Sequence, residues 1–177
     1  MNNDLGDLFN PPAKRQPPEI ILLDYVQTLV ENGSDPRRDD LQRTGRYREW
    51  IKLEHFRGYL IDLLKAYRAN GGLVILLTAR SNKYSVETMA QIRQHGDGFW
   101  PDDAYFNPGE LEPPKAKLWT LERKIFPKYG PVTPTRYLAL ESNVATRAMY
   151  AKVKIAALPV SYGKPWTELP MLPLSSQ

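Results

Sequence analysis

The stretch IILLDYVQT at residues 20–28 decides the fold of this chain. Its four leading apolar residues form an unbroken run, which is typical of a strand buried on both faces of a parallel sheet. The run ends at Asp24, and open α/β sheets bind their ligands at the carboxyl ends of their strands. The stretch therefore predicts a buried parallel strand with Asp24 in a candidate ligand site.

Two further apolar runs have the same form. The run at 73–77 is followed by Thr78, and the run at 137–140 is followed by Glu141. Because the carboxyl ends of parallel strands meet at one edge of a sheet, these polar residues are expected to lie near Asp24. Weaker strands are expected around 104–106 and 153–158.

Helical patterns separate the predicted strands. An apolar stripe with helical spacing predicts a helix over 56–67. A second helix is expected over 85–95, with Ser85 as its N-cap; its inward residues are predicted to be Val86, Met89 and Ile92. A third helix follows Pro113-Pro114, carries Leu118, Leu121 and Ile125, and is expected to end at Pro127 and Gly130. Strands alternating with helices indicate an α/β fold, a parallel sheet with helices on both faces.

Composition narrows the kinds of protein that fit. A length of 177 residues suits one well-cored domain. There is no apolar run long enough to span a bilayer, so we expect a soluble, intracellular (cytoplasmic) protein without a membrane partner. Cysteine is absent and only two histidines occur, so any metal is expected to be a hard cation held by carboxylates.

The domain organisation predicted from these patterns is a single core over 19–160. Prolines among polar residues indicate a flexible N-terminal arm at 1–18 and a proline-rich C-terminal tail at 161–177. The polar segment 31–52 has no clear period and is predicted to be a long loop or small flap. Its arginines, with Tyr47 and Trp50, resemble a surface for single-stranded nucleic acid. Acidic residues offset five of its six basic charges, however, which favours a solvated flap.

The order of these motifs resembles the haloacid-dehalogenase (HAD) superfamily, over roughly residues 19–160. The first motif of that family, Asp-x-Asp-x-Thr, corresponds to Asp24, Val26 and Thr28 here. Its second motif corresponds to Thr78, and its lysine motif fits best at Lys117, with Lys115 as the alternative. The closest outline is that of phage polynucleotide kinase-phosphatases. The resemblance implies a HAD-like (Rossmannoid) parallel sheet with a minimal cap or none.

The resemblance also implies roles for individual residues. Catalytic roles fall on Asp24 as nucleophile, on Thr28 of the first motif, and on Thr78 and Lys117, which would hold the phosphate oxygens. Substrate binding falls on Arg80 and Lys115. A Mg²⁺ ion would be held by Asp24, the main-chain carbonyl of Val26 and Glu141. Two simpler interpretations stay open: Glu141 could only pair with Lys117, and Arg80 could only form a surface ion pair.

Two departures from the family pattern affect the expected activity. Valine at position 26 cannot act as the general acid and base, a role worth roughly 10²- to 10⁴-fold in rate. Ser142 stands where the family has a second acid, so we expect weak or altered Mg²⁺-dependent phosphate-ester hydrolysis, with an open site that suits a nucleic-acid end. Asp39 or Asp40 on the flap is a candidate replacement for the missing acid.

Two alternatives remain. One is a catalytically inactive HAD-like protein that serves as a binding or structural subunit of an assembly, such as a viral one, with its proline-rich termini contacting protein partners. The other is a carbon–halogen or phosphonate hydrolase, which the lack of a substantial cap disfavours.

Overall fold

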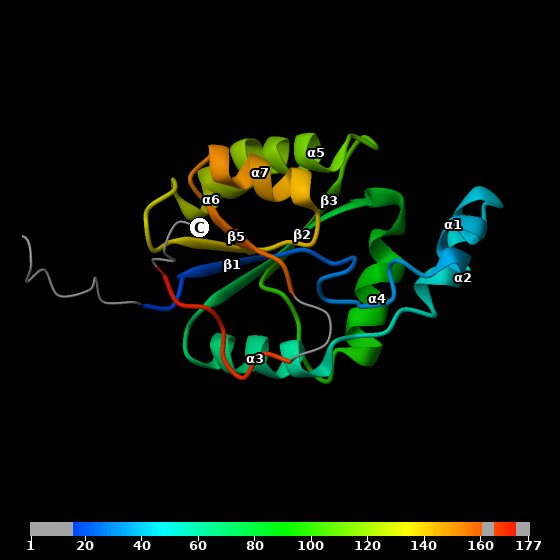
Figure 1. The fold of residues 1–177 in the computed structure, drawn as a ribbon, viewed down its shortest axis with the longest axis horizontal. Coiled ribbons are helices and arrows are strands. Elements are labelled where there is room, and N and C mark those ends of the chain that lie inside the picture. The colour runs from blue at the N-terminus through cyan, green and yellow to red at the C-terminus, as the bar shows by residue number, and fades with distance from the viewer. Residues whose placement is uncertain (1–15, 161–164, 173–177) are drawn as a thin grey trace, which may run out of the picture.

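A computed structural model of the chain describes residues 16–160 and 165–172. In this part of the chain five parallel strands form one sheet of order β3-β2-β1-β4-β5 (Figure 1). The strands are β1 (Ile20–Leu23), β2 (Leu73–Ser81), β3 (Asp103–Asn107), β4 (Tyr137–Leu140) and β5 (Ala156–Leu158). The predicted α/β class and parallel sheet are confirmed, and Asp24 follows the central strand.

Helices cover both faces of the sheet, as predicted (Figure 1). The α3 and α4 helices lie over one face, and α5, α7 and a π-helical turn, η3, lie over the other. Alternate residues of β1 serve the two cores, since Ile21 and Leu23 face α3 while Ile20 and Leu22 face α7. The elements are α3 (Gly58–Ala69), η2 (Asn82–Tyr84), α4 (Ser85–His95), α5 (Pro113–Thr120), η3 (Leu121–Ile125), α6 (Phe126–Tyr129) and α7 (Val144–Lys152).

Several helix details differ from the prediction. Ile92 is buried and Met89 packs against the core, as predicted, but Val86 is 79% exposed. Thr88 and Gln91 of α4 are buried in addition. The N-cap of α4 is Tyr84 rather than Ser85, since the short turn η2 leads into the helix. Pro127 does not end the helical segment, because α6 follows η3 without a break; the segment ends at Gly130, as predicted.

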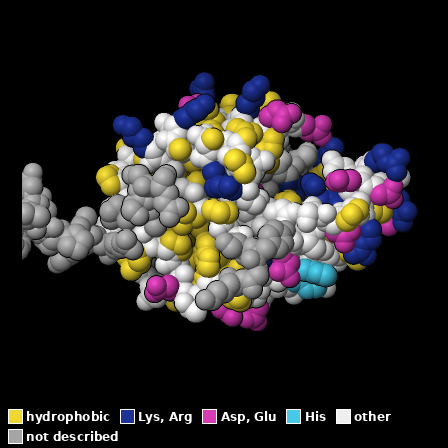
Figure 2. Space-filling model, viewed as in Figure 1, with side chains coloured by type: hydrophobic (Ala, Val, Ile, Leu, Met, Phe, Trp, Pro, Cys, Tyr) yellow, Lys and Arg dark blue, Asp and Glu magenta, His cyan; other side chains and the backbone are white. Residues whose placement is uncertain are grey.

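The segment 31–52 is a small helical flap rather than a loop. It forms α1 (Pro36–Arg43), capped by the Asp35 side chain, and α2 (Tyr47–Ile51). Tyr47, Trp50 and Ile51 are buried and pack with Leu41 and Tyr84 into a small core of the flap itself. Trp50 therefore offers no stacking surface. Figure 2 shows basic and acidic side chains interspersed over this end of the molecule, as expected for a solvated outer face.

The described parts of both predicted arms pack on the domain. Gln16 pairs in antiparallel fashion with Leu172, which is 2% exposed. Tyr67 Oη donates a hydrogen bond to the Pro18 carbonyl at 2.6 Å, so the last residues of the predicted N-terminal arm are anchored. The rest of that arm, residues 161–164 and residues 173–177 lie outside the described residues.

Among the described helices, none is long and apolar enough to cross a membrane.

Candidate active site

Asp24 is held at the carboxyl end of β1 by the turn that follows it. The Tyr25 carbonyl accepts hydrogen bonds from the N–H groups of Thr28, Leu29 and Val30, which folds the chain back at once. This turn brings Thr28 Oγ1 within 3.1 Å of Asp24 Oδ2. The first-motif residues Asp24 and Thr28 therefore meet as a hydrogen-bonded pair, and Asp24 is only 6% exposed.

Val26, at the position of the missing acid, lies in the same turn. Gln27 beside it has a φ of +66°, a left-handed conformation that is costly for a residue with a side chain. Gly33 at the start of the flap approaches so closely that a Cβ there would lie 2.6 Å from Val26 Cγ1. The turn is thus fixed by contact with the flap and exposes Val26 and Gln27 to the site.

Lys117 completes a buried charged cluster. It comes from α5, is 1% exposed, and its Nζ donates to Asp24 Oδ1 at 2.7 Å and to Glu141 Oε2. Burial lowers the pKa of Lys117, but the negative charges of Asp24 and Glu141 outweigh burial and leave its pKa raised. Lys117 therefore stays charged and can pass its hydrogen bonds to a bound anion. Lys115 is exposed and does not line this site.

Glu141 follows β4, and its carboxylate is occupied by neighbours. Its Oε2 accepts from Lys117, and its Oε1 accepts from the Asn143 N–H at 2.8 Å. Burial, followed by the nearby charge of Asp24, raises the pKa of Glu141 to about 7. The contacts of the Glu141 carboxylate are those of an ion pair with Lys117 and of a hydrogen bond from the Asn143 N–H, which agrees with the pairing interpretation.

A cavity of about 320 Å³ opens above this cluster. Thr78 borders it where β2 departs from regular pairing with β3, and its Oγ1 accepts from the Arg80 N–H at 3.2 Å. The Thr78 hydroxyl proton remains available to a ligand. We call this cavity the Asp24 pocket; it is lined by Asp24, Val26, Gln27, Arg38, Tyr47, Thr78, Ala79, Arg80, Pro113, Lys117, Glu141, Ser142 and Asn143.

Arg80 lies in a buried ion pair, not in the surface ion pair that was one of its two open interpretations. Its guanidinium pairs with Glu54, which follows the flap, and both side chains are 1% exposed. It also donates to Thr88 Oγ1 at 3.0 Å and to Tyr47 Oη at 3.3 Å. Tyr25 Oη donates to the same Glu54 carboxylate at 2.9 Å. Arg80, in β2, therefore connects the flap to α4 through its hydrogen bonds. Its charge is neutralised by Glu54.

The predicted Mg²⁺ ligands do not form a fitting set. The predicted set is Asp24, the Val26 carbonyl and Glu141, but both oxygens of the Glu141 carboxylate already accept hydrogen bonds, from Lys117 Nζ and from the Asn143 N–H. The side chain that faces this carbonyl is Ser142, whose Oγ lies 3.0 Å from Val26 O and 3.4 Å from Asp24 Oδ2. One carboxylate, one carbonyl and one hydroxyl are a weak donor set for a cation that dehydrates reluctantly. Among the described residues, no three acidic or histidine side chains cluster as metal ligands.

Sequence reasoning did not assign several residues of this site. Glu54, the partner of Arg80, carried no local signal, because it is 26 positions away and its role arises from packing. The sequence predicts no specific role for Arg38 of the flap, yet Arg38 lines the Asp24 pocket. Asp39 and Asp40 do not fold over the site: Asp39 is 82% exposed at its side chain, and Asp40 pairs with Arg43 at the surface.

No protein-family model and no curated protein sequence matches the chain. Solved structures do match its fold, an open parallel sheet with helices on both faces. A chain in the structure of the Pnkp1/Rnl/Hen1 RNA repair complex is similar at a TM-score of 0.58 and 18% identity. The match covers 84% of the present chain but only 43% of that one.

Single hydrolases are similar over most of their length. A HAD-superfamily hydrolase of subfamily IA from Geobacter sulfurreducens PCA matches at a TM-score of 0.54 and 13% identity, covering 79% of this chain and 88% of that chain. A predicted HAD-like hydrolase from Porphyromonas gingivalis matches at 0.55 and 14%, covering 85% and 94%. The chain therefore has the HAD-like fold that its motif order implied.

Proposed function

We propose that this protein binds a phosphate monoester in the Asp24 pocket and hydrolyses it slowly. One observation carries the proposal: Asp24 is buried beside Lys117 and Thr28 in a cavity that Thr78 also borders. A carboxylate nucleophile, a cation and a hydroxyl donor are the groups that phosphoryl transfer to a side chain requires. The likeness to HAD-superfamily hydrolases supports the same reaction type.

The chemistry follows from the positions of these groups. The Asp24 carboxylate attacks phosphorus, and the bond to the leaving oxygen breaks with its electron pair going to that oxygen. Lys117 and Thr78 donate hydrogen bonds to the phosphoryl oxygens as charge develops. Water then attacks the aspartyl phosphate, releases inorganic phosphate and restores the carboxylate.

Proton transfer is the weak step. Val26 cannot donate a proton to the leaving oxygen, and Gln27 beside it has an amide that does not titrate. The leaving oxygen must therefore take its proton from water, which favours esters with acidic leaving groups such as aryl phosphates. A metal ion would normally offset the charge of the phosphate, but the metal ligands here form a weak set. Lys117 therefore offsets this charge.

A second candidate, phosphate binding without turnover, is favoured by the contacts of Ser142. Its hydroxyl lies between Asp24 Oδ2 and the Val26 carbonyl, and Lys117 holds Asp24 Oδ1. Both oxygens of Asp24 are thus engaged, which lowers the nucleophilicity of the carboxylate. A protein that binds phosphate without hydrolysing it would act as a binding subunit. The similarity to a chain of an RNA repair complex is compatible with this second candidate.

The test is phosphate release from an aryl phosphate, measured with and without Mg²⁺, with Asp24→Asn as the paired control. Release by the wild type that falls to background in the variant supports hydrolysis at Asp24. Equal release by both proteins refutes it. Absence of release, together with binding of inorganic phosphate that depends on Lys117, leaves the binding function.

A further inference from the structure

The helices α5, η3, α6 and α7 lie in a segment with an excess of positive charge. Residues 113–154 hold nine of the 24 lysine and arginine residues of the chain but two of its 20 aspartate and glutamate residues. In Figure 2 dark blue side chains lie over the top of the molecule, where Figure 1 has α5 and α7, with yellow side chains between them. The positive charge of the protein is thus concentrated over these helices.

Most of the basic residues in this segment lack an acidic partner. Four of the nine are engaged by acidic side chains or by main-chain carbonyls. The acidic residue of these four helices is Glu122, which is itself exposed. The other five basic residues are exposed and form no ion pair with any residue that the structure describes: Lys115, Arg123, Lys124, Lys152 and Lys154.

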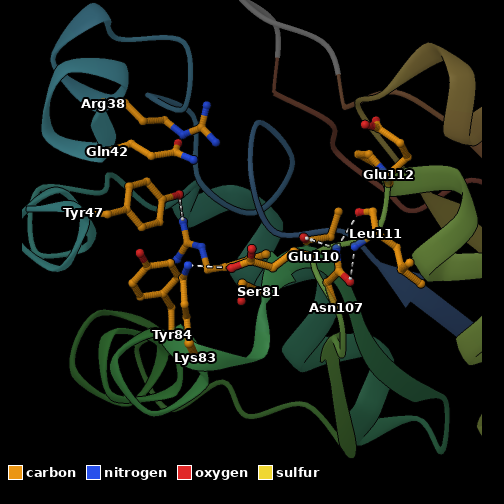
Figure 3. A pocket seen from close by; sticks show the side chains of 13 residues that line it. Arg38, Gln42, Tyr47, Ser81, Lys83, Tyr84, Asn107, Glu110, Leu111 and Glu112 are labelled. Carbon is orange, nitrogen blue, oxygen red and sulfur yellow. Dashed lines mark hydrogen bonds and ion pairs between the residues drawn. The ribbon is translucent and has the colours of Figure 1, made fainter. Parts of the chain in front are cut away.

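Exposed basic residues on other parts of the surface are mostly paired. Lys65 on α3 pairs with Asp97 at 2.7 Å. Lys83 pairs with Glu110 at 2.6 Å in the wall of a second cavity, of about 480 Å³, which adjoins the Asp24 pocket at Arg38 (Figure 3). The flap has three such pairs, Arg37–Asp35, Arg43–Asp40 and Arg46–Glu49. The unpaired charges over α5 and α7 are therefore the ones best placed to bind an anionic partner.

Apolar side chains are exposed on the same helices. Trp119 on α5 is 41% exposed, and Lys124 Nζ lies 6.0 Å from its ring centroid. Val144, the first residue of α7, is 72% exposed, and three alanines of α7 are exposed as well, at 145, 148 and 151. We call the exposed residues of α5, η3 and α7, together with Lys154, the α5/α7 face. Its side chains line neither the Asp24 pocket nor the second cavity.

We propose that the α5/α7 face binds an acidic, amphipathic segment of a partner protein. The carboxylates of such a segment would meet the lysines, and its apolar side chains would cover Trp119 and Val144. This inference goes beyond the proposed function, because the face lies outside the Asp24 pocket and takes no part in phosphate chemistry.

Two other polyanions fit this face less well. Val144 and the alanines of α7 have no flat ring, so the bases of a nucleic acid would not stack on this helix. These side chains are also short, so they would not reach the acyl boundary of a membrane, where interfacial helices bury their apolar face by roughly 5–10 Å. A protein segment can satisfy both the charges and the aliphatic surface between them.

Binding of a labelled synthetic peptide, followed by fluorescence anisotropy, tests the proposal. Glutamate and leucine recur at helical spacing in this peptide, and a reference peptide has glutamine in place of each glutamate. The protein should bind the acidic peptide about tenfold more tightly than the reference peptide. It should also bind the acidic peptide more tightly than a single-stranded oligonucleotide of equal charge or vesicles that contain phosphatidylserine.

Two double variants locate the binding surface. Lys124→Glu with Lys152→Glu should weaken binding of the acidic peptide by about tenfold, because each change replaces an attraction by a repulsion. Lys52→Glu with Arg93→Glu is the matched control and should retain binding. It changes the net charge equally, but both residues lie outside the α5/α7 face, where they are exposed and form no ion pair with the described residues.

Val144→Ser tests the apolar contribution and should weaken peptide binding several-fold, because less apolar area is covered. Urea unfolding checks that each variant is folded. Aryl phosphate release should be the same in all of these variants, so failure of this inference and failure of the proposed function are separate results.

Three outcomes would overturn the inference. One is equal affinity of the two double variants for the acidic peptide. Another is equal binding of the acidic and reference peptides by the wild type. Tighter binding of the oligonucleotide or of the vesicles than of the acidic peptide would overturn the assignment to a protein partner.

Discussion

The floor of the Asp24 pocket, formed by Asp24, Lys117 and Glu141, contains a buried cation, and so does the base of the flap. The two cations have different partners. In the floor, Lys117 is shared by Asp24 and Glu141, which follow two neighbouring strands. At the flap, Arg80 is paired with Glu54 and fixed by Tyr47 and Thr88. The Lys117 ammonium group, between two carboxylates, can also donate a hydrogen bond to a bound anion. The Arg80 guanidinium already binds several partners and therefore keeps those neighbours in place.

Lys117 is therefore expected to take part in the reaction, whereas Arg80 is expected to stabilise the flap. Changes in the floor are expected to alter rate and metal binding, and changes at the base of the flap are expected to alter stability.

The largest expected effect is a gain of rate from Val26→Asp. An acid at this position would protonate the leaving oxygen, and general acid catalysis contributes roughly 10²- to 10⁴-fold. The measurement is kcat for an aryl phosphate and for an alkyl phosphate, with the larger gain for the alkyl ester. Val26→Asn is the control, since it matches the size of aspartate without its proton. Equal rates for the two variants would show that the floor lacks more than an acid.

The next effect is on stability. Arg80→Gln leaves Glu54 buried without its cation, and breaking a buried pair in this way lowers the free energy of unfolding by about 3–5 kcal/mol. Urea unfolding measures the loss. Arg46→Gln is the matched control on the flap, because Arg46 pairs with Glu49 in solvent, and it should leave stability nearly unchanged. Similar losses in both variants would mean that Arg80 is not the anchor of the flap.

The smallest effect concerns the cation. Ser142→Asp would place a carboxylate beside Asp24 Oδ2 and the Val26 carbonyl, and so complete a set of ligands for Mg²⁺. At a Mg²⁺ concentration 100-fold above its Kd, the variant should be stabilised by about 2.7 kcal/mol. Thermal unfolding with MgCl2, against NaCl of matched ionic strength, measures the shift. The wild type and Ser142→Asn should not respond, and a wild-type shift as large as that of the variant would show that the native floor already holds the ion.

The sequence predicted the sheet because its signals are local. The unbroken apolar runs at 20–23, 73–77 and 137–140 are the strands that fill the middle of the sheet. Parallel strands bring their carboxyl ends to one edge, so the residues that follow them, including Asp24 and Glu141, were expected together and lie together. The helix over 85–95 was also predicted, with Ile92 correctly placed inward. The burial of Thr88 was not predicted, because it depends on a hydrogen bond from Arg80.

Tertiary structure decided the contacts that determine what the site can do. Lys117 reaches Asp24 across 93 positions, and Glu54 reaches Arg80 across 26. Neither pairing has a periodic signal, because each depends on how α5 and the flap dock on the sheet. The same docking set the orientation of three further side chains. Glu141 is directed to Lys117, Ser142 to the Val26 carbonyl, and Arg38 to the cavities. A sequence pattern places a residue at a strand end or on a helix, but the packing of distant segments decides which charge that residue meets.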